Sequence, residues 1–218
     1  MTEVESHHNN LVGSIPVELA DLSQLRVLVL WGNGFDEWGL SGVIPPEVGT
    51  LSHLEMFALG HNDEVSIPPE LGNLSNLQTL EIAAAVTPAD QSELLDNGCT
   101  TLPPEVGNLS SLQSLRISYS LCGNIPPELG ELSNLQVLDL GWNYGLSGSI
   151  PPELGNLSNL TFLSLAWDYH ACILEPSPGP LSGPLPPELG NLTNLQHLNL
   201  YCQSFSGPIP MSFINLLD

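Results

Sequence analysis

The stretch from Leu146 to Leu165 reads LSGSIPPELGNLSNLTFLSL, and this pattern returns along the chain with small changes. Around Ile125 the chain reads NIPPELGELSNLQVLDL, and around Leu185 it reads PLPPELGNLTNLQHLNL. The apolar residue before the proline marks each copy, at Ile15, Ile44, Ile67, Leu102, Ile125, Ile150, Leu185 and Ile209. A self-similar unit that recurs every 23 to 35 residues indicates a repeat architecture.

Within each copy the leucine spacing shortens from three to two. The three-residue spacing is typical of a tight helical turn, and the final L-x-L predicts a short strand with one buried face. One unit cannot bury its apolar side alone, so neighbouring units must stack into a solenoid with one leucine core and one parallel strand per unit. We expect the strands to centre on Leu28, Phe57, Leu80, Leu115, Leu138, Leu163 and Leu198.

The consensus LxxLxxLxLxxN followed by xLSGxIPPELGNL resembles the leucine-rich repeat family in its plant-type subclass. That subclass includes the extracellular domains of receptor-like kinases, receptor-like proteins and polygalacturonase inhibitors. The resemblance covers nearly the whole chain. It implies an α/β solenoid, a right-handed superhelix of about seven complete repeats, with a parallel sheet on the concave face and short 3-10 or α turns on the convex side.

We expect a single solenoid over residues 1–218. Residues 1–21 read as a partial N-terminal repeat, residues 22–207 as repeats, and residues 208–218 as a partial C-terminal repeat. Insertions at 34–39, 86–100 and 169–180 leave from one rim, just after the strand; such insertions often mark a binding side, although surface loops also tolerate extra length at little cost. We interpret the chain as an excerpt of a longer array, or as an array with open ends.

The charge balance excludes some partners. The formal net charge is −22, from 24 acidic residues against two arginines and no lysine. Nucleic acid is therefore not expected as a partner, and neither is an anionic membrane surface. No apolar run of about 20 residues is present, so we expect no membrane insertion by this segment, and no secretory signal pattern is found. The family resemblance implies an extracellular or cell-surface location.

No motif for catalysis is present. The chain has no G-x-S-x-G, no H-E-x-x-H and no P-loop, and its histidines are scattered. We therefore expect no enzyme activity, no cofactor and no metal site. A column of glutamates follows the prolines, where a carboxylate favours the start of a helical turn; a cation-binding ladder is the alternative. These glutamates are Glu18, Glu47, Glu70, Glu105, Glu128, Glu153 and Glu188.

An asparagine ladder is expected behind the strands. A buried asparagine at this position bonds the backbone of the turn. The matching residues are Asn9, Asn33, Asn62 and Asn143. The pattern is broken at Ala85, Ser120, Asp168 and Gln203.

The outward strand positions can be read as columns across the sheet. The middle column is Val29, Ala58, Glu81, Arg116, Asp139, Ser164 and Asn199. Arg116 thus stands between Glu81 and Asp139 on adjacent strands, which predicts an ion-pair ladder.

A later column gathers aromatic residues. It reads Gly32, His61, Ala84, Tyr119, Trp142, Trp167 and Cys202. Exposed aromatic rings are enriched in binding hot spots, although these rings can instead stack on one another under the 169–180 insertion. We expect Trp142 and Trp167 in side-chain contact, with Tyr119 next. The candidate ligand-binding residues are Tyr119, Trp142, Trp167, Phe162, Tyr201 and His197, with Tyr144 and Tyr169 close by.

The four cysteines predict two disulfides. Cys99 and Cys122 each stand three residues before an anchor, in one column of adjacent units, and stacked positions about 5 Å apart suit a disulfide. Cys172 and Cys202 form the second predicted pair, which requires the insertion to fold back. Four free thiols, as in a reducing cytosol, are the alternative.

N-x-S/T sequons add a possible modification. Glycosylation of these asparagines would require secretion from a eukaryote, whereas GNLS is also simply the repeat consensus. The sequons begin at Asn73, Asn108, Asn156, Asn159 and Asn191.

Three functions remain open. The first is a non-enzymatic extracellular module that recognises a protein, peptide or glycan across the concave face and the insertion-bearing rim. The second is a structural surface or filament component that self-associates end to end. The third, an ice- or mineral-binding surface, ranks low because the outward columns are too irregular for a flat crystal plane.

Overall fold

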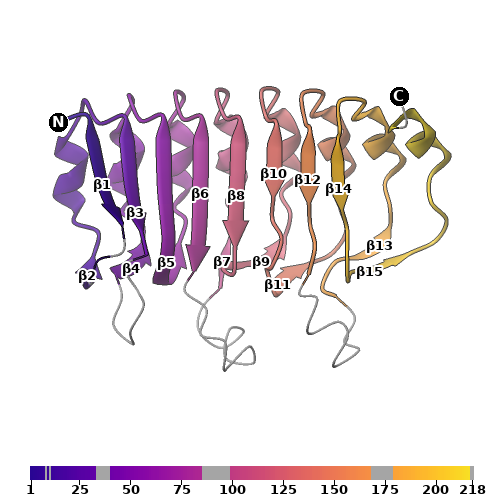
Figure 1. Cartoon of the computed structure of the whole chain (residues 1–218), viewed down its shortest axis with the longest axis horizontal. Helices are drawn as coiled ribbons and strands as arrows, with labels where there is room; N and C mark the ends of the chain where they lie inside the picture. Colours follow the sequence, from indigo (N-terminus) through magenta and orange to yellow (C-terminus); the bar gives the residue numbers. More distant parts are fainter. Residues whose placement is uncertain (8, 10, 33–39, 85–98, 168–178, 217–218) are drawn as a thin grey trace.

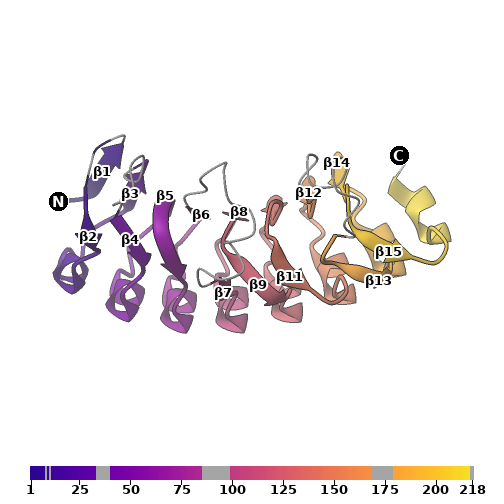
Figure 2. The same ribbon diagram turned by 90° about the horizontal axis from the view of Figure 1, so that it is seen from below.

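The computed structural model describes residues 1–7, 9, 11–32, 40–84, 99–167 and 179–216. Parallel strands stand side by side along the chain, with short 3-10 helices behind them (Figure 1). Seen from below, the strands lie on the inner side of a shallow arc and the helices on the outer side (Figure 2). The expected α/β solenoid, with its sheet on the concave face, is therefore confirmed.

The main sheet keeps one register from unit to unit. Leu28 pairs with Phe57, and the partners continue through the leucine of each later strand to Leu198. All seven predicted residues thus lie in parallel strands at one register, and Val4 pairs with Leu28 ahead of them. They are the central residues of β10, β12 and β14, whereas the four earlier strands extend further past them than predicted. The strands are β1 (Glu3–His7), β3 (Val27–Trp31), β5 (Met56–Ser66), β6 (Thr79–Ala84), β8 (Ser114–Ser118), β10 (Val137–Asp139), β12 (Phe162–Ser164) and β14 (His197–Asn199).

Short 3-10 helices form the convex side. A proline with extended backbone precedes each of the first seven of these, and a glutamate lies in the first turn, as its proposed local role requires. The helices are η1 (Val17–Asp21), η2 (Pro46–Thr50), η3 (Pro69–Asn73), η5 (Pro104–Asn108), η6 (Pro127–Glu131), η7 (Pro152–Asn156), η8 (Pro187–Asn191) and η9 (Met211–Leu216).

A glycine lets each helix approach the next. A Cβ placed on Gly49 would come within 2.8 Å of the carbonyl carbon of Glu70 in the following unit. The same conflict recurs at Gly72, Gly107, Gly130, Gly155 and Gly190. In the first unit Ala20 occupies this position. The glycine of the ELGNL motif is therefore a packing requirement between units.

Further parallel strands, which the repeat pattern does not predict, join the units between the main strands and the helices. They arise because stacked turns pair their backbone groups along the same direction as the main strands. They are β2 (Gly13–Ser14), β4 (Leu40–Val43), β7 (Thr100–Thr101), β9 (Leu121–Asn124), β11 (Gly145–Ser147), β13 (Ser182–Pro184) and β15 (Ser204–Ser206).

The core is a continuous column of leucine layers. Leu54, Leu77, Leu112 and Leu135 are among the side chains with no exposed surface, and all belong to one cluster. No helix in the described part of the chain is both long enough and apolar enough to cross a bilayer.

Asn143 confirms the role predicted for the asparagine ladder. Its buried Oδ1 accepts hydrogen bonds from the backbone N–H groups of Ser120 (3.0 Å) and Leu121 (2.9 Å). Its Nδ2 donates to the carbonyls of Ile117 (2.7 Å) and Leu140 (2.9 Å). One side chain therefore satisfies backbone groups in two adjacent units.

Gln203 replaces an asparagine without losing this function. Its Oε1 accepts from the Leu181 N–H (2.9 Å), and its Nε2 donates to the Leu165 carbonyl (2.6 Å). Among the described residues, the exposed Asn9 bonds Ser6 and His7 of the strand just before it, and no bond to a neighbouring unit is seen there. Asn33, Ala85, Asp168 and the side chain of Asn62 lie outside the described residues.

A second asparagine ladder, absent from our predictions, runs along the opposite edge of the strands. Each Nδ2 donates to a serine carbonyl of the preceding unit at 2.7 to 2.8 Å. The donors are Asn76, Asn134, Asn159 and Asn194.

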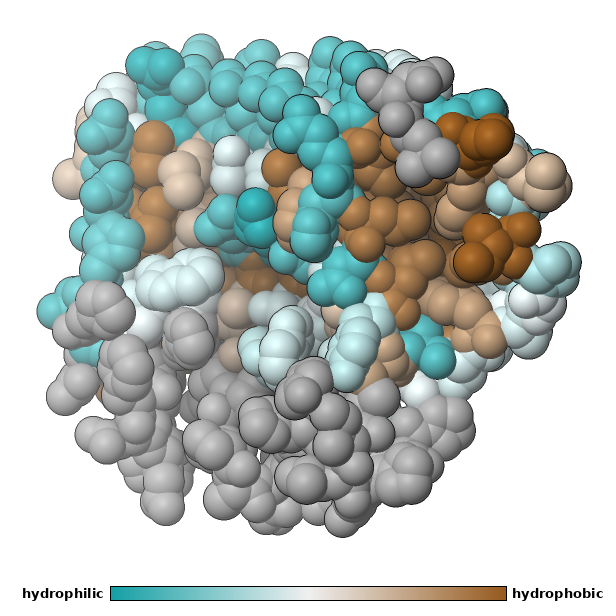
Figure 3. Space-filling view, turned by 45° about the vertical axis from the view of Figure 1, so that its right-hand side comes forward, coloured by the Kyte–Doolittle hydropathy of each residue, from teal (hydrophilic) through white to brown (hydrophobic). Residues whose placement is uncertain are grey.

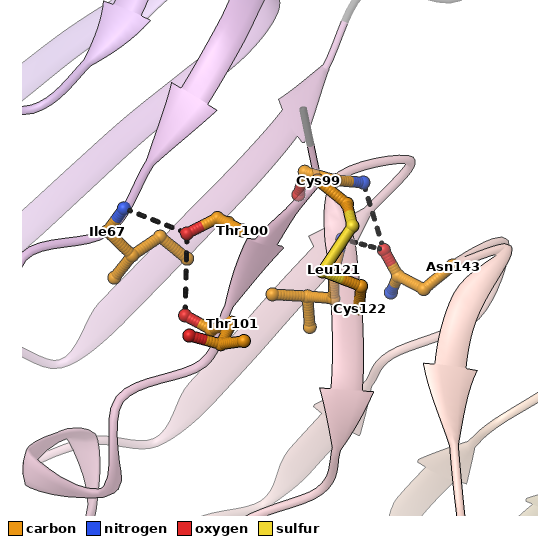
Figure 4. Close-up of a disulfide and its surroundings, with 8 residues drawn as sticks. Ile67, Cys99, Thr100, Thr101, Leu121, Cys122 and Asn143 are labelled. Atoms are coloured by element: carbon orange, nitrogen blue, oxygen red, sulfur yellow. Dashed lines mark hydrogen bonds between the residues drawn. A yellow bond between two sulfur atoms is a disulfide. The ribbon is translucent and has the colours of Figure 1, made fainter. Parts of the chain in front are cut away.

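The predicted bridge between Cys99 and Cys122 is present (Figure 4), with the two Cα atoms 5.5 Å apart. Next to it, Thr100 and Thr101 of β7 pair with Leu121 and Cys122 of β9. The bridge thus ties the last residues of the 86–100 insertion to the following unit. Cys202 is disulfide-bonded, but Cys172 lies outside the described residues, so the second pairing stays a prediction. The insertions also lie outside, except for residues 99–100 and 179–180.

Candidate ligand-binding face

The middle outward column of the concave face is confirmed residue by residue in the strand register. Arg116 Nη1 lies 3.3 Å from Asp139 Oδ2, and Arg116 Nε lies 3.7 Å from Glu81 Oε1. The Gly141 N–H donates to the other Asp139 oxygen at 3.1 Å. The predicted ion-pair ladder is therefore present, with one arginine between two carboxylates.

The next outward column consists mainly of small residues, which our sequence analysis did not single out. Trp31 pairs with Gly60, Gly60 with Ala83, and Ala83 with Ser118. Gly141 continues the column beyond the end of β10. A Cβ on Gly60 would overlap the ring of Trp31, so the missing side chain gives the indole its place. Reading one more column from the sequence would have found this pattern.

A groove of about 180 Å³ lies over this column. Ala83, Ser118 and Gly141 lie along it between the indoles of Trp31 and Trp142. The ion-pair ladder of Glu81, Arg116 and Asp139 lines it as well. Small residues below and large aromatic residues beside it leave a hollow in the concave face.

Tyr119 and Trp142 lie just past the ends of β8 and β10, and this corrects their expected placement on the strands. Both have left-handed backbones, with φ of 60° and 61°. Gly32 and Cys202, in the same column, have φ of 69° and 58°. At these four positions the column is the turn at which the chain leaves the main sheet, whereas His61 and Ala84 of the same column still lie in β5 and β6. Bulky residues rarely adopt this conformation, so surrounding structure must hold Tyr119 and Trp142 in it.

The ring contacts lead from Trp142 through Tyr119 and Tyr144 to Trp167, so the expected neighbourhood of Tyr119 and Trp142 is confirmed, whereas direct contact between Trp142 and Trp167 stays a prediction. Tyr119 packs against Trp142 with ring centroids 5.7 Å apart and against Tyr144 at 6.2 Å. Tyr144 meets Trp167 edge to face at 6.1 Å. The Trp167 Nε1 is buried and has no hydrogen-bond partner in the described structure. Trp142, at 38 % exposure, is more accessible.

The other candidate residues form a separate group. Phe162 stacks on His197 with centroids 4.7 Å apart and planes within 9°. Arg116 Cζ lies 5.6 Å from the Phe162 ring centroid, which connects this pair to the ladder. Tyr201 is 45 % exposed, and its carbonyl accepts from the Trp167 N–H. The six predicted residues thus flank the concave face and do not form one cluster.

Both arginines of the chain are paired with carboxylates. Arg26 makes two hydrogen bonds to Glu55 in the next unit, from Nε at 2.9 Å and from Nη2 at 2.8 Å. These bonds raise the pKa of Arg26 and lower the pKa of Glu55. This pair was not predicted, although the two residues share a column. With Arg116 also paired, the chain keeps no arginine free for an anionic ligand.

The sequon asparagines separate into two classes. Four of the five end their 3-10 helices and are exposed on the convex side: Asn73, Asn108, Asn156 and Asn191. Asn159 instead uses its side-chain amide to bond the Ser133 carbonyl at 2.8 Å. Only the first class presents an uncommitted amide for modification.

Comparison with known proteins agrees with this architecture. The Leucine Rich Repeat family model matches residues 134–157 and 194–216, and no curated protein matches the chain. One similar solved structure is that of the Arabidopsis receptor kinase HAESA in complex with the peptide hormone IDA and the co-receptor SERK1. The two sequences are 29 % identical, and the alignment covers 99 % of this chain and 32 % of that chain, with a TM-score of 0.73.

Two further solved receptors are similar. The plant peptide hormone receptor RGFR1, in complex with RGF2, is 30 % identical over 99 % of this chain and 30 % of that chain, with a TM-score of 0.71. PEPR1 with AtPEP1 is 35 % identical over 97 % of this chain and 30 % of that chain, with a TM-score of 0.65. The chain thus spans about a third of the length of these structures.

Proposed function

The chain belongs to the leucine-rich repeat family, with units of the plant type, and we propose that it is a non-enzymatic scaffold that binds a protein or peptide segment on its concave face. The groove between Trp31 and Trp142 carries this proposal. Small residues such as Ala83 and Ser118 let a bound backbone approach the sheet closely. Two indoles beside it supply the kind of aromatic contact that dominates binding energy.

The solved relatives support a segment of polypeptide as the ligand. HAESA is described in complex with the peptide hormone IDA, and RGFR1 is described as a plant peptide hormone receptor in complex with RGF2. We propose the insertion-bearing rim as a second contact, since the insertions follow β3, β6 and β12 in the chain. A glycan ligand, which aromatic rings also suit, is a competing outcome that a glycan array would reveal.

A displayed library of random 12-residue peptides, selected on the purified chain, tests the proposal. Ser118→Arg places a large side chain in the groove and is expected to abolish binding of the selected peptides. Ser110→Arg, at an exposed position after η5, is the matched control and is expected to leave binding unchanged. Peptides that bind both variants equally would show that the groove is not the site.

We also propose an extracellular or cell-surface setting. The Cys99–Cys122 bridge is typical of oxidising compartments, and four sequon asparagines are exposed on the convex side. Secretion from a eukaryotic host is expected to add glycans at Asn73, Asn108, Asn156 or Asn191 and to leave Asn159 unmodified. Peptide mapping by mass spectrometry checks each position.

Self-association is a second candidate function. Brown, apolar surface gathers toward the C-terminal end of the molecule (Figure 3). Ile209, Met211 and Ile214 are exposed there by 73 %, 86 % and 64 %. If copies associate through this surface, the molar mass from light scattering should rise with concentration. Ile214→Lys should abolish the rise, and Ser133→Lys, at an exposed position in the turn after η6, should not.

A further inference from the structure

We propose that the groove contains a subsite for a cationic side chain, an arginine or lysine of the bound peptide segment. This inference rests on the proposed function and specifies the chemistry that the concave face recognises. The subsite is formed by the carboxylates of Glu81 and Asp139 together with the indoles of Trp31 and Trp142, all of which line the same groove.

The ion-pair ladder leaves negative charge in the groove. Two carboxylates face one guanidinium, so the ladder carries a net charge of about −1. Glu81 reaches Arg116 only at 3.7 Å, beyond hydrogen-bond distance, and has no other polar partner in the described structure. Its two oxygens thus retain their capacity to accept hydrogen bonds from a ligand.

The two carboxylates are accessible as well as incompletely paired. The Glu81 side chain is 29 % exposed, and that of Asp139 is 30 % exposed. The Gly141 N–H and Arg116 hold Asp139 by one bond to each of its oxygens, which fixes its orientation. A carboxylate oxygen accepts more than one hydrogen bond, so a ligand ammonium or guanidinium can add to these contacts.

The aromatic walls favour the same ligand group. Indole is the best aromatic partner for a cation, and a guanidinium also stacks flat on such rings. The Trp31 ring lies over Gly60, and Trp142 is 38 % exposed past the end of β10. A basic side chain that enters between them would bury its methylene groups on the small residues and bring its charge to Glu81.

The charge of the whole chain points to the same partner. A net charge of −22 attracts cations over long range and repels anions. Both arginines already pair with carboxylates of neighbouring units. A phosphate, sulfate or carboxylate ligand would therefore find no lysine and no unpaired arginine, whereas a basic peptide finds both steering charge and a local acceptor.

Peptides recovered from the random library on the wild-type chain provide the test. We expect the recovered peptides to share an arginine or lysine at one position. The probe is the tightest of them that loses binding to Ser118→Arg, and its matched analogue carries citrulline or glutamine at that position. Calorimetry at 0.15 M salt should show an affinity loss of about tenfold or more for the analogue.

Variants of the protein show which carboxylate contacts the basic side chain of the peptide. Glu81→Gln should weaken the parent peptide about tenfold and leave the neutral analogue unchanged, because only the charged ligand group meets this carboxylate. Glu105→Gln makes the same change of charge on η5, on the convex side, and should alter either affinity by less than about twofold. Asp139→Asn repeats the test at the second carboxylate.

The outcomes separate the two proposals. Ser118-dependent peptides that lack a shared basic residue, or that bind Glu81→Gln as tightly as the wild type, overturn the cationic subsite and leave peptide recognition standing. Equal losses of peptide affinity in Glu81→Gln and Glu105→Gln would show only a general attraction between the acidic chain and the basic peptide, and would also overturn the subsite. A library without any Ser118-dependent binder overturns both the subsite and the proposed function.

Discussion

Asn143 shows how one side chain fixes the geometry of adjacent units. It makes four hydrogen bonds shorter than 3.1 Å, two accepted and two donated, to backbone groups of two units. All of these groups are buried, so water cannot replace the asparagine if it is lost. Its contribution therefore comes mainly from the cost of leaving the backbone unsatisfied.

Asn143→Ala is expected to lower the free energy of unfolding by about 3 kcal/mol, since buried backbone donors and acceptors lose their partner. Urea denaturation followed by circular dichroism measures the change. Asn134→Ala is the matched control: this exposed side chain makes one bond, to the Ser110 carbonyl, and its loss should cost less than about 1 kcal/mol. Equal losses in the two variants would contradict this account.

The Arg26–Glu55 pair predicts a shifted titration. The hydrogen bonds from Arg26 favour the ionised carboxylate, so the pKa of Glu55 lies below its ordinary value of 4.5. Because the folded pKa is lowered, the contribution of the pair is present above the unfolded pKa and is lost as the pH falls through the folded pKa. NMR titration of the Glu55 carboxyl carbon measures the shift.

Arg26→Gln should return the pKa of Glu55 towards its ordinary value, whereas Arg116→Gln should leave it unchanged. Arg116 pairs instead with Glu81 and Asp139, which lie in other units than Glu55. A pKa of Glu55 that does not respond to Arg26→Gln would argue against the pair in solution.

At the scale of the elements, the stacking of 3-10 helices depends on glycine. Gly107→Ala brings a Cβ within 2.8 Å of the Glu128 carbonyl carbon, and η5 must then move away from η6. We expect a loss of about 1–3 kcal/mol in unfolding free energy, as for other overpacked sites. Ala20→Gly, at the same position of the first unit, should change stability by less than about 1 kcal/mol. Thermal unfolding compares the two variants.

The Cys99–Cys122 bridge joins elements that are 23 residues apart in the chain. The double substitution Cys99→Ala and Cys122→Ala removes the bridge. In the chain-entropy model this should lower the free energy of unfolding by about 3 kcal/mol. Intact mass before and after reduction measures the bridges directly, since each adds about two daltons of hydrogen when it opens. No gain in mass would remove the best support for an oxidising compartment.

At the scale of the whole molecule, the solenoid gains stability from contacts between neighbours, so its units need not be equally stable. Leu115 and Leu138, in β8 and β10, have no exposed surface. Val4 in β1 and Leu198 in β14 are only partly buried. Local opening should therefore require less free energy in the outer units than in the central ones.

Hydrogen exchange read by mass spectrometry tests this gradient. Peptides that cover β8 and β10 should exchange slowest, and those that cover β1 and β14 should exchange first. The control is the same experiment on Asn143→Ala, which should speed exchange chiefly around β8 to β11. Uniform exchange along the chain would show that the molecule opens as one cooperative unit.

The sequence by itself determined the repeat and its register. Leucines spaced by three and then by two allow only one arrangement in which every unit buries its apolar face, and this is why the seven strands and their register were predicted correctly. The same register placed Arg116 between Glu81 and Asp139 and Cys99 beside Cys122. Both follow because equivalent positions of adjacent units lie about 5 Å apart.

Tertiary structure alone decided where the strands end and what lies between the columns. The left-handed turns at Tyr119 and Trp142 moved these residues off the strands, and Tyr144 brought the rings of Tyr119 and Trp167 into one series of contacts. The groove depends on where the Trp31 indole lies, and that depends on the absent side chain of Gly60 in the next unit. Such features arise from contacts between side chains of several units. The residue types at equivalent positions do not by themselves specify in which direction each side chain points.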